Sequence, residues 1–423
     1  MTRFTVSMAV LAAALSACAQ PAEIDPVTAS SAAPVTVTAG PNPSDLTFEK
    51  RVELLTNLFN ADSIVENFSN MDGVFLSNPL SVDTATPWPV EVTSLPDTVT
   101  IAGKVRPTRD VLDELDTTSL VIIRDGILIH EEYNDGTQAD DLRISWSVAK
   151  SFMSGLYGNV LANGQIGSLD DLVTQYVPEL VGTAYDGATI RNVLNMASGI
   201  RFDENYADPD SDINKMGQVV ALGGSLDDYT ASLTESAREP GTQFQYVSMD
   251  THVGAWVLRR ATGKTLHELF EETYGPMGFE RAPYYLVDGQ NVAFALGGLN
   301  LTTRDYARFG QLFLQEGEWE GEQIIPADWV RESTRPSAPG EIPGRPTGYA
   351  YQWWIPTPFD GDYMAAGIYG QYVYVDPDTG IVIAKTAADR EFMGANADGI
   401  YSFQVNADLF RSLAEQLAEK PTE

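Results

Sequence analysis

The hydrophobic and polar pattern of the chain is strand-like, then helical, then strand-like again. Two runs rich in β-branched residues, 119–123 and 127–133, are joined by Arg124-Asp125-Gly126, which is typical of a hairpin turn. Apolar residues then recur at helical spacing over 147–161. Residues 162–290 are predicted to be mostly helical, with loops rich in Gly, Asp and Pro.

The C-terminal part adds further helices and then returns to strands. Helical patterns cover 302–315 and 327–334, and a last amphipathic helix covers 403–417. Three strands are predicted between them, at 349–355, 366–375 and 381–386, with a turn at 376–380.

Strands near both ends of the chain, with helices between them, predict one sheet built from distant segments. We therefore expect an α/β fold of the α+β kind, a mainly antiparallel sheet flanked by helices, with a large helical insertion at about 162–290. This domain is predicted to span 111–420. Residues 46–110 are interpreted as an N-terminal extension that packs on it.

The first residues have the pattern of a secretory signal. Arg3 precedes an apolar run, 4–15, which is too short to span a membrane comfortably. Leu15-Ser16-Ala17-Cys18 resembles a bacterial lipobox, which implies a signal peptide at 1–17 and lipidation of Cys18. Residues 18–45 would then be a lipid-anchored flexible linker. The alternative is an ordinary signal peptide with an accidental cysteine.

The protein is therefore expected to be exported, as a periplasmic or cell-envelope lipoprotein that meets the membrane only through the anchor at Cys18.

The composition limits the possible partners and covalent links. Acidic residues number 59 against 26 basic ones and are scattered along the chain, giving a net charge of −33. Such a surface repels phosphates, so nucleic acid is excluded as a partner. With one cysteine, the chain forms no intramolecular disulfide.

Ser147 and Lys150 are the first candidates for catalysis. At the start of a helix, residues i and i+3 share one face, so the two side chains would meet. A serine hydroxyl needs a base to become a nucleophile, and a lysine serves when burial favours its neutral form. The helix N-terminus suits a developing oxyanion. The spacing alone also fits a capping serine and a solvent-exposed lysine.

Tyr246 is the third candidate. It follows the turn at Pro240-Gly241 and precedes a helical stretch at 250–262, so it could face the serine and relay a proton. Taken alone, a half-buried packing tyrosine is the simpler interpretation.

Other kinds of site have weaker support. No Gly-x-Ser-x-Gly occurs, and the three histidines, His130, His252 and His267, are interpreted as structural. Asp208, Asp210 and Asp212 resemble the start of a calcium loop, but the glycine that such a loop needs is absent. We therefore expect no metal and no cofactor.

Several motifs together resemble the serine β-lactamase and penicillin-binding superfamily. They are Ser147-x-x-Lys150 and Tyr246-x-Ser248, with the surrounding segments 144–151, 189–199, 240–242, 298–305 and 366–371. Within that superfamily the sequence most resembles the class C-like esterases and the 6-aminohexanoate-dimer hydrolases. The resemblance covers about residues 111–420.

The resemblance implies roles for individual residues. Ser147 would be acylated, Lys150 would activate it, and Tyr246 would share the proton transfers. The oxyanion hole would consist of the backbone N–H groups of Ser147 and Ile368. Tyr206 resembles a tyrosine beside the substrate amide in the dimer hydrolases. Three more residues are expected to bind substrate, namely Ser248, Gly367 and Tyr369.

The sequence also departs from the β-lactamase pattern. Ser248 replaces an asparagine, and Ala365-Ala366-Gly367 replaces Lys-Thr-Gly. Lys385-Thr386-Ala387 is similar but comes one strand later, so we do not assign it to the site. The leading hypothesis is a serine hydrolase of small-molecule esters or amides. Two alternatives are a weak β-lactamase or penicillin-binding protein, and a non-catalytic binding lipoprotein of the same fold.

Overall fold

The computed structural model describes residues 53, 55–342 and 347–418. The predicted signal peptide at 1–17, the lipidation site Cys18 and the linker at 18–45 lie outside these residues. Within the described part of the chain, no helix is long and apolar enough to cross a membrane.

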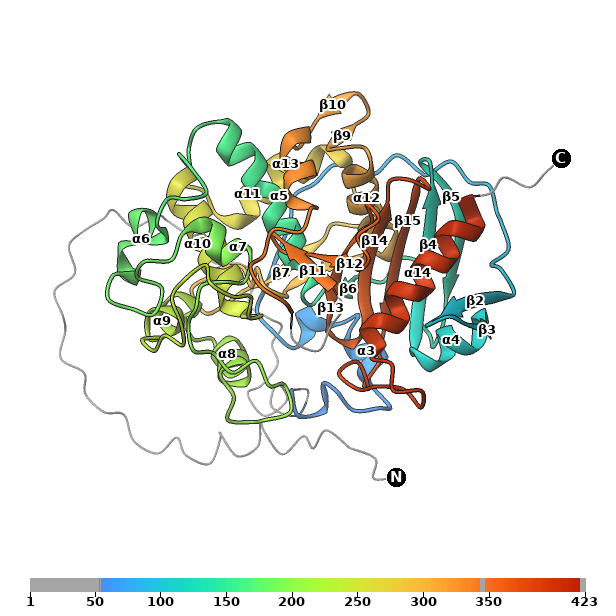
Figure 1. Ribbon diagram of the computed structural model, residues 1–423, viewed down its shortest axis with the longest axis horizontal. Helices are drawn as coiled ribbons and strands as arrows, with labels where there is room; N and C mark the ends of the chain where they lie inside the picture. Colours follow the sequence, from blue (N-terminus) through green and yellow to red (C-terminus); the bar gives the residue numbers. More distant parts are fainter. Residues whose placement is uncertain (1–52, 54, 343–346, 419–423) are drawn as a thin grey trace.

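A seven-stranded antiparallel sheet forms the centre of the fold (Figure 1). Its strand order is β11-β12-β13-β14-β15-β4-β5, so an N-terminal hairpin pairs directly with the last strand of the chain. The prediction of one antiparallel sheet built from distant segments is confirmed. The strands are β4 (Thr117–Arg124), β5 (Ile127–Tyr133), β11 (Thr347–Ala350), β12 (Trp353–Pro356), β13 (Tyr363–Gly367), β14 (Gln371–Asp376) and β15 (Ile381–Ala387).

The turn between β4 and β5 has the predicted chemistry. Asp125 and Gly126 both have positive φ, 49° and 77°. Two left-handed residues in succession are what a hairpin turn matching the strand twist requires, and Asp-Gly adopts that conformation readily. The turn residues therefore set the first pairs of the hairpin, Arg124 with Ile127 and Ile123 with Leu128, and a bulge shifts the register beyond them.

The predicted single strand at 349–355 is wrong. The chain reverses at Tyr351 and Gln352, both with positive φ, and forms the two strands β11 and β12. The turn contains neither Gly nor Asn, and hydrogen bonds to another segment of the chain hold it in place. Asn195 Oδ1 accepts a hydrogen bond from Tyr351 N at 3.0 Å, and the Gln352 amide donates to the carbonyls of Val193 and Leu194. Such a turn has no local sequence signal.

The predicted strand at 366–375 is also wrong in the same way. A short 3₁₀ turn, η4 (Ile368–Gly370), separates β13 from β14, which pair with each other. Tyr369 takes a left-handed φ of 59° there. Because the apolar run continues through the turn, the hydrophobic pattern does not reveal the reversal.

Helices cover both faces of this sheet. On one face α14 (Ser402–Ala418) packs Phe410 against Tyr372 and Tyr374, at ring separations of 5.4 and 5.5 Å. On the other face lies α12 (Thr303–Leu314), capped by Thr302, whose Oγ1 accepts from Asp305 N at 3.1 Å. The sheet is thereby the middle layer between helices, as predicted.

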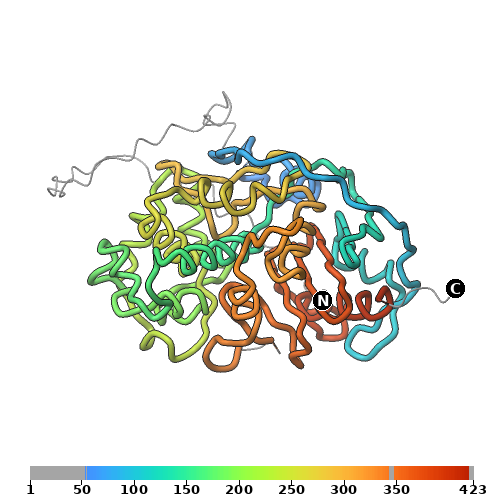
Figure 2. The backbone as a smooth tube through the Cα atoms, turned by 90° about the horizontal axis from the view of Figure 1, so that it is seen from above, coloured from blue at the N-terminus to red at the C-terminus, as the bar shows by residue number. Residues whose placement is uncertain are grey.

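Most of the remaining helices form a second region beside the sheet, drawn mainly in green and yellow in Figure 2. It contains α6 (Val173–Tyr176), α7 (Ile190–Leu194), α8 (Asp212–Ala221), α9 (Leu226–Ala231), α10 (Ser248–Thr262) and α11 (Leu266–Tyr274), with α13 (Ala327–Ser333) nearby. The helix α5 (Val148–Ala162) lies between the two regions and is buried along most of its length.

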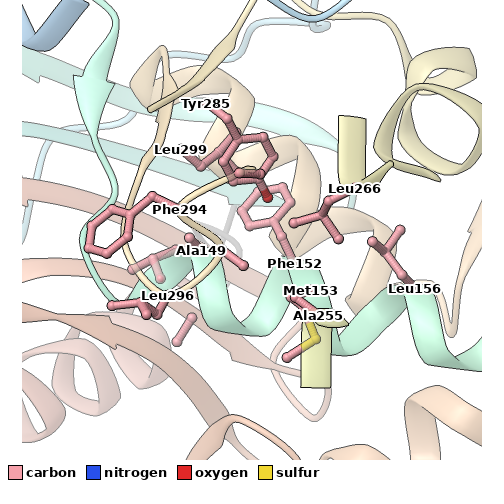
Figure 3. Close-up of a cluster of buried hydrophobic side chains, with 14 of the residues drawn as sticks. Ala149, Phe152, Met153, Leu156, Ala255, Leu266, Tyr285, Phe294, Leu296 and Leu299 are labelled. Carbon is pink, nitrogen blue, oxygen red and sulfur yellow. The ribbon is translucent and has the colours of Figure 1, made fainter. Parts of the chain in front are cut away.

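Figure 3 shows how α5 is held. Its residues Ala149, Phe152, Met153 and Leu156 meet side chains from α10 and α11 and from the strands of a small second sheet. That sheet has the order β1-β7-β8-β6, and its strands are β1 (Ser77–Pro79), β6 (Arg143–Ile144), β7 (Tyr284–Leu286) and β8 (Leu299–Leu301). The helix that carries Ser147 at its start is therefore packed on several sides by apolar groups, which restricts its movement.

Residues before the β4 hairpin pack on the same body. The short helix α3 (Ile64–Asn67) buries Ile64, Phe68 directly after it is fully buried, and Leu80 is buried just after strand β1. Two further elements, β2 (Thr98–Ile101) and β3 (Lys104–Pro107), form a hairpin next to α14, and α4 (Thr108–Glu114) follows. A small hairpin outside the main sheet contains β9 (Glu318–Trp319) and β10 (Glu322–Gln323).

Candidate active site

Ser147 lies at the N-terminus of α5, after a sharp turn of the backbone. Trp146 has a φ of 43°, an unfavourable value for a bulky residue, and its ring is held by Phe68 and Tyr369. The Ser147 hydroxyl makes no capping hydrogen bond to the helix. The capping-serine interpretation is therefore wrong, and Ser147 lines a cavity instead.

Lys150 lies one helical turn further on and is only 1% exposed. Its Nζ donates to Leu296 O at 2.6 Å and to Ser248 Oγ at 3.3 Å. Burial lowers the pKa of Lys150 to about 7, although the negative charges of Glu204 and Asp250 oppose the shift. The solvent-exposed interpretation is therefore wrong. A neutral amine that donates two hydrogen bonds still has a lone pair to accept a proton.

Among the described residues no hydrogen bond joins Ser147 Oγ to Lys150 Nζ. Both groups belong to one face of the same helix, as the spacing predicts. Catalytic hydrogen bonds often tighten only when substrate binds, so this separation is compatible with proton transfer between them.

A carboxylate that the sequence analysis missed completes the polar network. Glu204 accepts hydrogen bonds from Ser248 N at 2.9 Å, from Tyr206 OH at 2.8 Å and from Ser248 Oγ. Burial raises the pKa of Glu204, and the neighbouring Lys150 charge works in the opposite direction. Lys150, Ser248, Glu204 and Tyr206 thus form one hydrogen-bonded chain. The only signal for Glu204 in the sequence is its position two residues before Tyr206.

The cavity in front of Ser147 has a volume of about 420 Å³. Its walls are largely apolar and aromatic, with Phe244, Trp354, Tyr372, Phe392 and Phe403 contributing rings. Such a surface favours a substrate with apolar parts, because burying them releases water.

Tyr246 lines the same cavity as Ser147. Its ring stacks on Trp354 with centroids 5.5 Å apart, and Lys150 Nζ lies 5.6 Å from the centroid of the Tyr246 ring. The structure therefore brings together the three predicted residues Ser147, Lys150 and Tyr246, which lie on separate segments of the sequence.

The end of β13 lies directly against the start of α5. A Cβ atom placed on Gly367 would be 2.6 Å from Ser145 O and 3.1 Å from Ser147 N, so only glycine allows this approach. The next residue, Ile368, lines the cavity together with Gly367. The two backbone groups predicted as oxyanion donors, those of Ser147 and Ile368, therefore border the same cavity.

The remaining predicted substrate-binding residues differ in position. Tyr206 lines the cavity, whereas Ser248 is buried behind it, between Lys150 and Glu204. Tyr369 points into an aromatic cluster, where its ring stacks on Phe59 at 5.2 Å. It supports Trp146 from behind and does not contribute to the cavity wall.

Lys385 lies away from the cavity wall. It sits on β15, which β14 separates from β13, and its Nζ donates to Gly370 O at 3.5 Å. Burial lowers its pKa to about 8, with Asp389 and Asp116 opposing the shift.

The described residues contain no cluster of His, Cys, Asp or Glu able to hold a metal ion. One of the histidines, His252, pairs with Asp227 at 2.7 Å.

Comparison with known proteins identifies the family. The family profile described as Beta-lactamase matches residues 109–405. The chain belongs to the beta-lactamase family. A 6-aminohexanoate-dimer hydrolase from Paenarthrobacter ureafaciens is 32% identical to this chain over 290 residues, which cover 66% of this chain and 74% of that protein.

Solved structures with a similar fold agree with this assignment. The proposed 6-aminohexanoate-dimer hydrolase of Bacillus anthracis superposes with a TM-score of 0.76 at 26% identity, covering 86% of this chain and 97% of the other. A family VIII carboxylesterase shares the fold at a TM-score of 0.55 and 16% identity, over 73% of this chain and 96% of its own. The resemblance and the fold predicted from the sequence are confirmed, and the protein is a beta-lactamase-fold hydrolase.

Proposed function

We propose that this protein hydrolyses ester or amide bonds of small molecules through an acyl-enzyme on Ser147. The observation that carries the proposal is Lys150, a buried lysine one helical turn from Ser147 whose pKa is lowered to about 7 by burial. At neutral pH a large fraction of Lys150 is the free base, which is the form that can accept the serine proton.

The reaction follows from the positions of these groups. Ser147 Oγ attacks the substrate carbonyl carbon, and its proton passes to Lys150 Nζ. The carbonyl oxygen becomes an oxyanion that the N–H groups of Ser147 and Ile368 stabilise. When the tetrahedral intermediate collapses, the leaving group takes a proton from Lys150 by way of Tyr246. Water then attacks the acyl carbonyl carbon, and its proton passes by way of Tyr246 to Lys150. Ser147 Oγ takes this proton as it leaves, which releases the acid and restores Ser147.

The relatives support both ester and amide chemistry. One is named for hydrolysis of a 6-aminohexanoate dimer and another is a carboxylesterase. We expect β-lactam turnover to be weak, because β13 carries Ala365 and Ala366 where β-lactamases carry Lys-Thr. Export and lipidation at Cys18 remain part of the proposal and rest on the sequence pattern alone.

The test compares the soluble protein lacking residues 1–18 with its Ser147→Ala variant, using a short-chain p-nitrophenyl ester. We expect Ser147→Ala to reduce kcat by roughly 10³-fold or more. Ser154→Ala is the matched control, because it makes the same change in the same helix at a buried hydroxyl without a hydrogen-bond partner among the described residues.

Three outcomes separate the hypotheses. Loss of turnover in Ser147→Ala alone, with an acyl adduct on Ser147 detected by mass spectrometry, supports the proposal. Equal activity of parent and Ser147→Ala shows that the nucleophile is wrong. A single stoichiometric acylation of the parent without turnover favours the binding-protein alternative.

A further inference from the structure

Both predicted oxyanion donors adjoin a bulky residue with a left-handed backbone. Trp146, directly before Ser147, has a φ of 43°, and Tyr369, directly after Ile368, has a φ of 59°. Side chains with a Cβ atom rarely adopt this conformation, and it persists only where the surrounding structure holds it. The placement of the two donor N–H groups therefore depends on what holds Trp146 and Tyr369.

Two phenylalanines of the N-terminal extension pack on both of these rings. Phe59 stacks on Tyr369 with centroids 5.2 Å apart and planes at 11°, and its centroid lies 6.0 Å from that of Trp146. Phe68, which is fully buried, meets both rings edge-on, at 5.6 Å from Trp146 and 5.3 Å from Tyr369. We call Phe59, Phe68, Trp146 and Tyr369 the aromatic clamp. In the described part of the chain none of its four rings lines the active-site cavity, so the clamp supports the site from behind.

Hydrogen bonds tie the segment of Phe68 to the strand that leads into Ser147. Ile144 N donates to Phe68 O at 3.0 Å, and Arg143 Nη1 donates to Ser69 Oγ at 2.9 Å. Arg143 and Ile144 form β6, which ends shortly before Ser147. The extension is thus fixed to the backbone that it supports.

The segment that carries Phe59 is in turn tied to that of Phe68. Asn67, the last residue of α3, donates through Nδ2 to Asn57 O at 2.9 Å and to Leu58 O at 3.0 Å. These two carbonyls directly precede Phe59, and Phe68 directly follows Asn67. The backbone therefore places the two phenylalanine rings relative to each other.

We propose that the N-terminal extension positions the oxyanion hole through Phe59 and Phe68. The two phenylalanines keep the rings of Trp146 and Tyr369 in place, and these rings keep the backbone beside the donor N–H groups in its left-handed conformation. The inference rests on the proposed function, because the oxyanion hole belongs to that mechanism. Both positioning residues precede residue 109, where the match to the family profile begins.

The expected effect is on the rate and not on substrate affinity. Without its ring partners, the backbone at Trp146 and Tyr369 can relax toward commoner φ values, which turns the donor N–H groups away from the developing oxyanion. Oxyanion hydrogen bonds act mainly in the transition state, whereas other residues line the cavity that binds the substrate. A weakened clamp should therefore lower kcat and leave KM nearly unchanged.

The test compares Phe59→Leu with Phe75→Leu in the p-nitrophenyl ester assay. Phe59 is half-buried, so leucine should be accommodated, and Phe59→Met is a second variant if Phe59→Leu folds poorly. Phe75 is the matched control, because it is a buried ring of the same extension without a ring partner among the described residues. We expect Phe59→Leu to lower kcat roughly tenfold with KM within about twofold of the parent, and Phe75→Leu to keep kcat. Phe59→Tyr retains the ring and should keep kcat as well.

The inference is overturned if Phe59→Leu and Phe75→Leu have equal kcat, or if Phe59→Tyr loses as much kcat as Phe59→Leu. A change in KM alone would overturn it too, since that would mean an effect on the cavity. Thermal unfolding of each variant is measured first, so that all assays are run on folded protein.

Labelling of Ser147 by a fluorophosphonate, followed by mass spectrometry, is measured alongside because it needs no turnover. Ser147 Oγ displaces fluoride from phosphorus, and the phosphoryl oxygen takes the oxyanion position. The labelling rate should fall in Phe59→Leu and stay at the parent value in Phe75→Leu. A parent that is not labelled at Ser147 overturns the proposed function together with this inference, whereas equal labelling rates in the parent and all variants overturn this inference alone.

Discussion

The chain of hydrogen bonds from Lys150 to Glu204 gives a quantitative prediction about pH. If neutral Lys150 is the base, kcat/KM should rise with pH through about 7, the pKa to which burial lowers Lys150. Below that pH the ammonium form has no lone pair. Glu204 stabilises the ammonium, so replacing it with the neutral glutamine should lower the pKa of Lys150 further and move the rise to lower pH.

The size of the expected change in the pKa of Lys150 follows from the distance between Lys150 and Glu204. Ser248 Oγ lies between the two charges, 3.3 Å from Lys150 Nζ, and a second hydrogen bond joins it to Glu204. Two hydrogen-bond lengths place the charges within roughly 6 Å of each other. At an effective dielectric constant of about 20, their attraction is about 3 kcal/mol, equivalent to roughly 2 pKa units. We therefore expect Glu204→Gln to move the rise of kcat/KM down by roughly 1 to 2 pH units.

The assay is the pH profile of kcat/KM for p-nitrophenyl acetate, from about pH 5 to 9, which reports the pKa of the free enzyme. The control is Asp203→Asn, the same change of charge at the neighbouring exposed carboxylate. Its profile should match that of the parent. A rise in Glu204→Gln that stays in place or moves to higher pH would refute the assigned role of Glu204. A parent profile rising only near the ordinary lysine pKa would refute desolvation of Lys150.

Two glycine substitutions test close packing. Gly367→Ala puts a Cβ atom 2.6 Å from Ser145 O, so we expect displacement of Ser147 and at least a roughly tenfold loss of kcat/KM for the ester. Gly310→Ala, on α12, puts a Cβ atom 2.5 Å from Val382 Cγ1, and should lower the free energy of unfolding by about 1–3 kcal/mol in urea denaturation. Gly217→Ala, in α8 with open space around it, should instead be neutral or stabilising. Full activity in Gly367→Ala, or unchanged stability in Gly310→Ala, would contradict these contacts.

The sequence predicts those parts of the fold whose signals are local. The hairpin at Asp125-Gly126 and the helix after Ser147 each follow from a few adjacent residues, and both are present. The reversal at Tyr351-Gln352 was missed because its stabilising partners come from α7 and α10. No rule about neighbouring residues can find a turn whose hydrogen bonds are tertiary.

The same distinction applies to the site. Ser147 and Lys150 are three residues apart, so their proximity could be derived from helical geometry alone. Tyr246 was placed by resemblance, and the structure puts it on the same cavity. Glu204 could not be derived in either way, because its role depends on meeting Ser248, 44 residues later in the chain.

The pairing of β4 with β15 has a consequence for biosynthesis. β4 is made early, and every residue of it is buried in the finished protein, but its partner β15 follows only after almost the whole domain. Until then the growing chain carries an apolar strand with an open edge, which favours association with other chains or with a chaperone. The strand β13, which places Gly367 against Ser147, is also synthesised late. A nascent chain therefore contains its nucleophile long before it can be active, and a product released before residue 381 has no way to close its sheet.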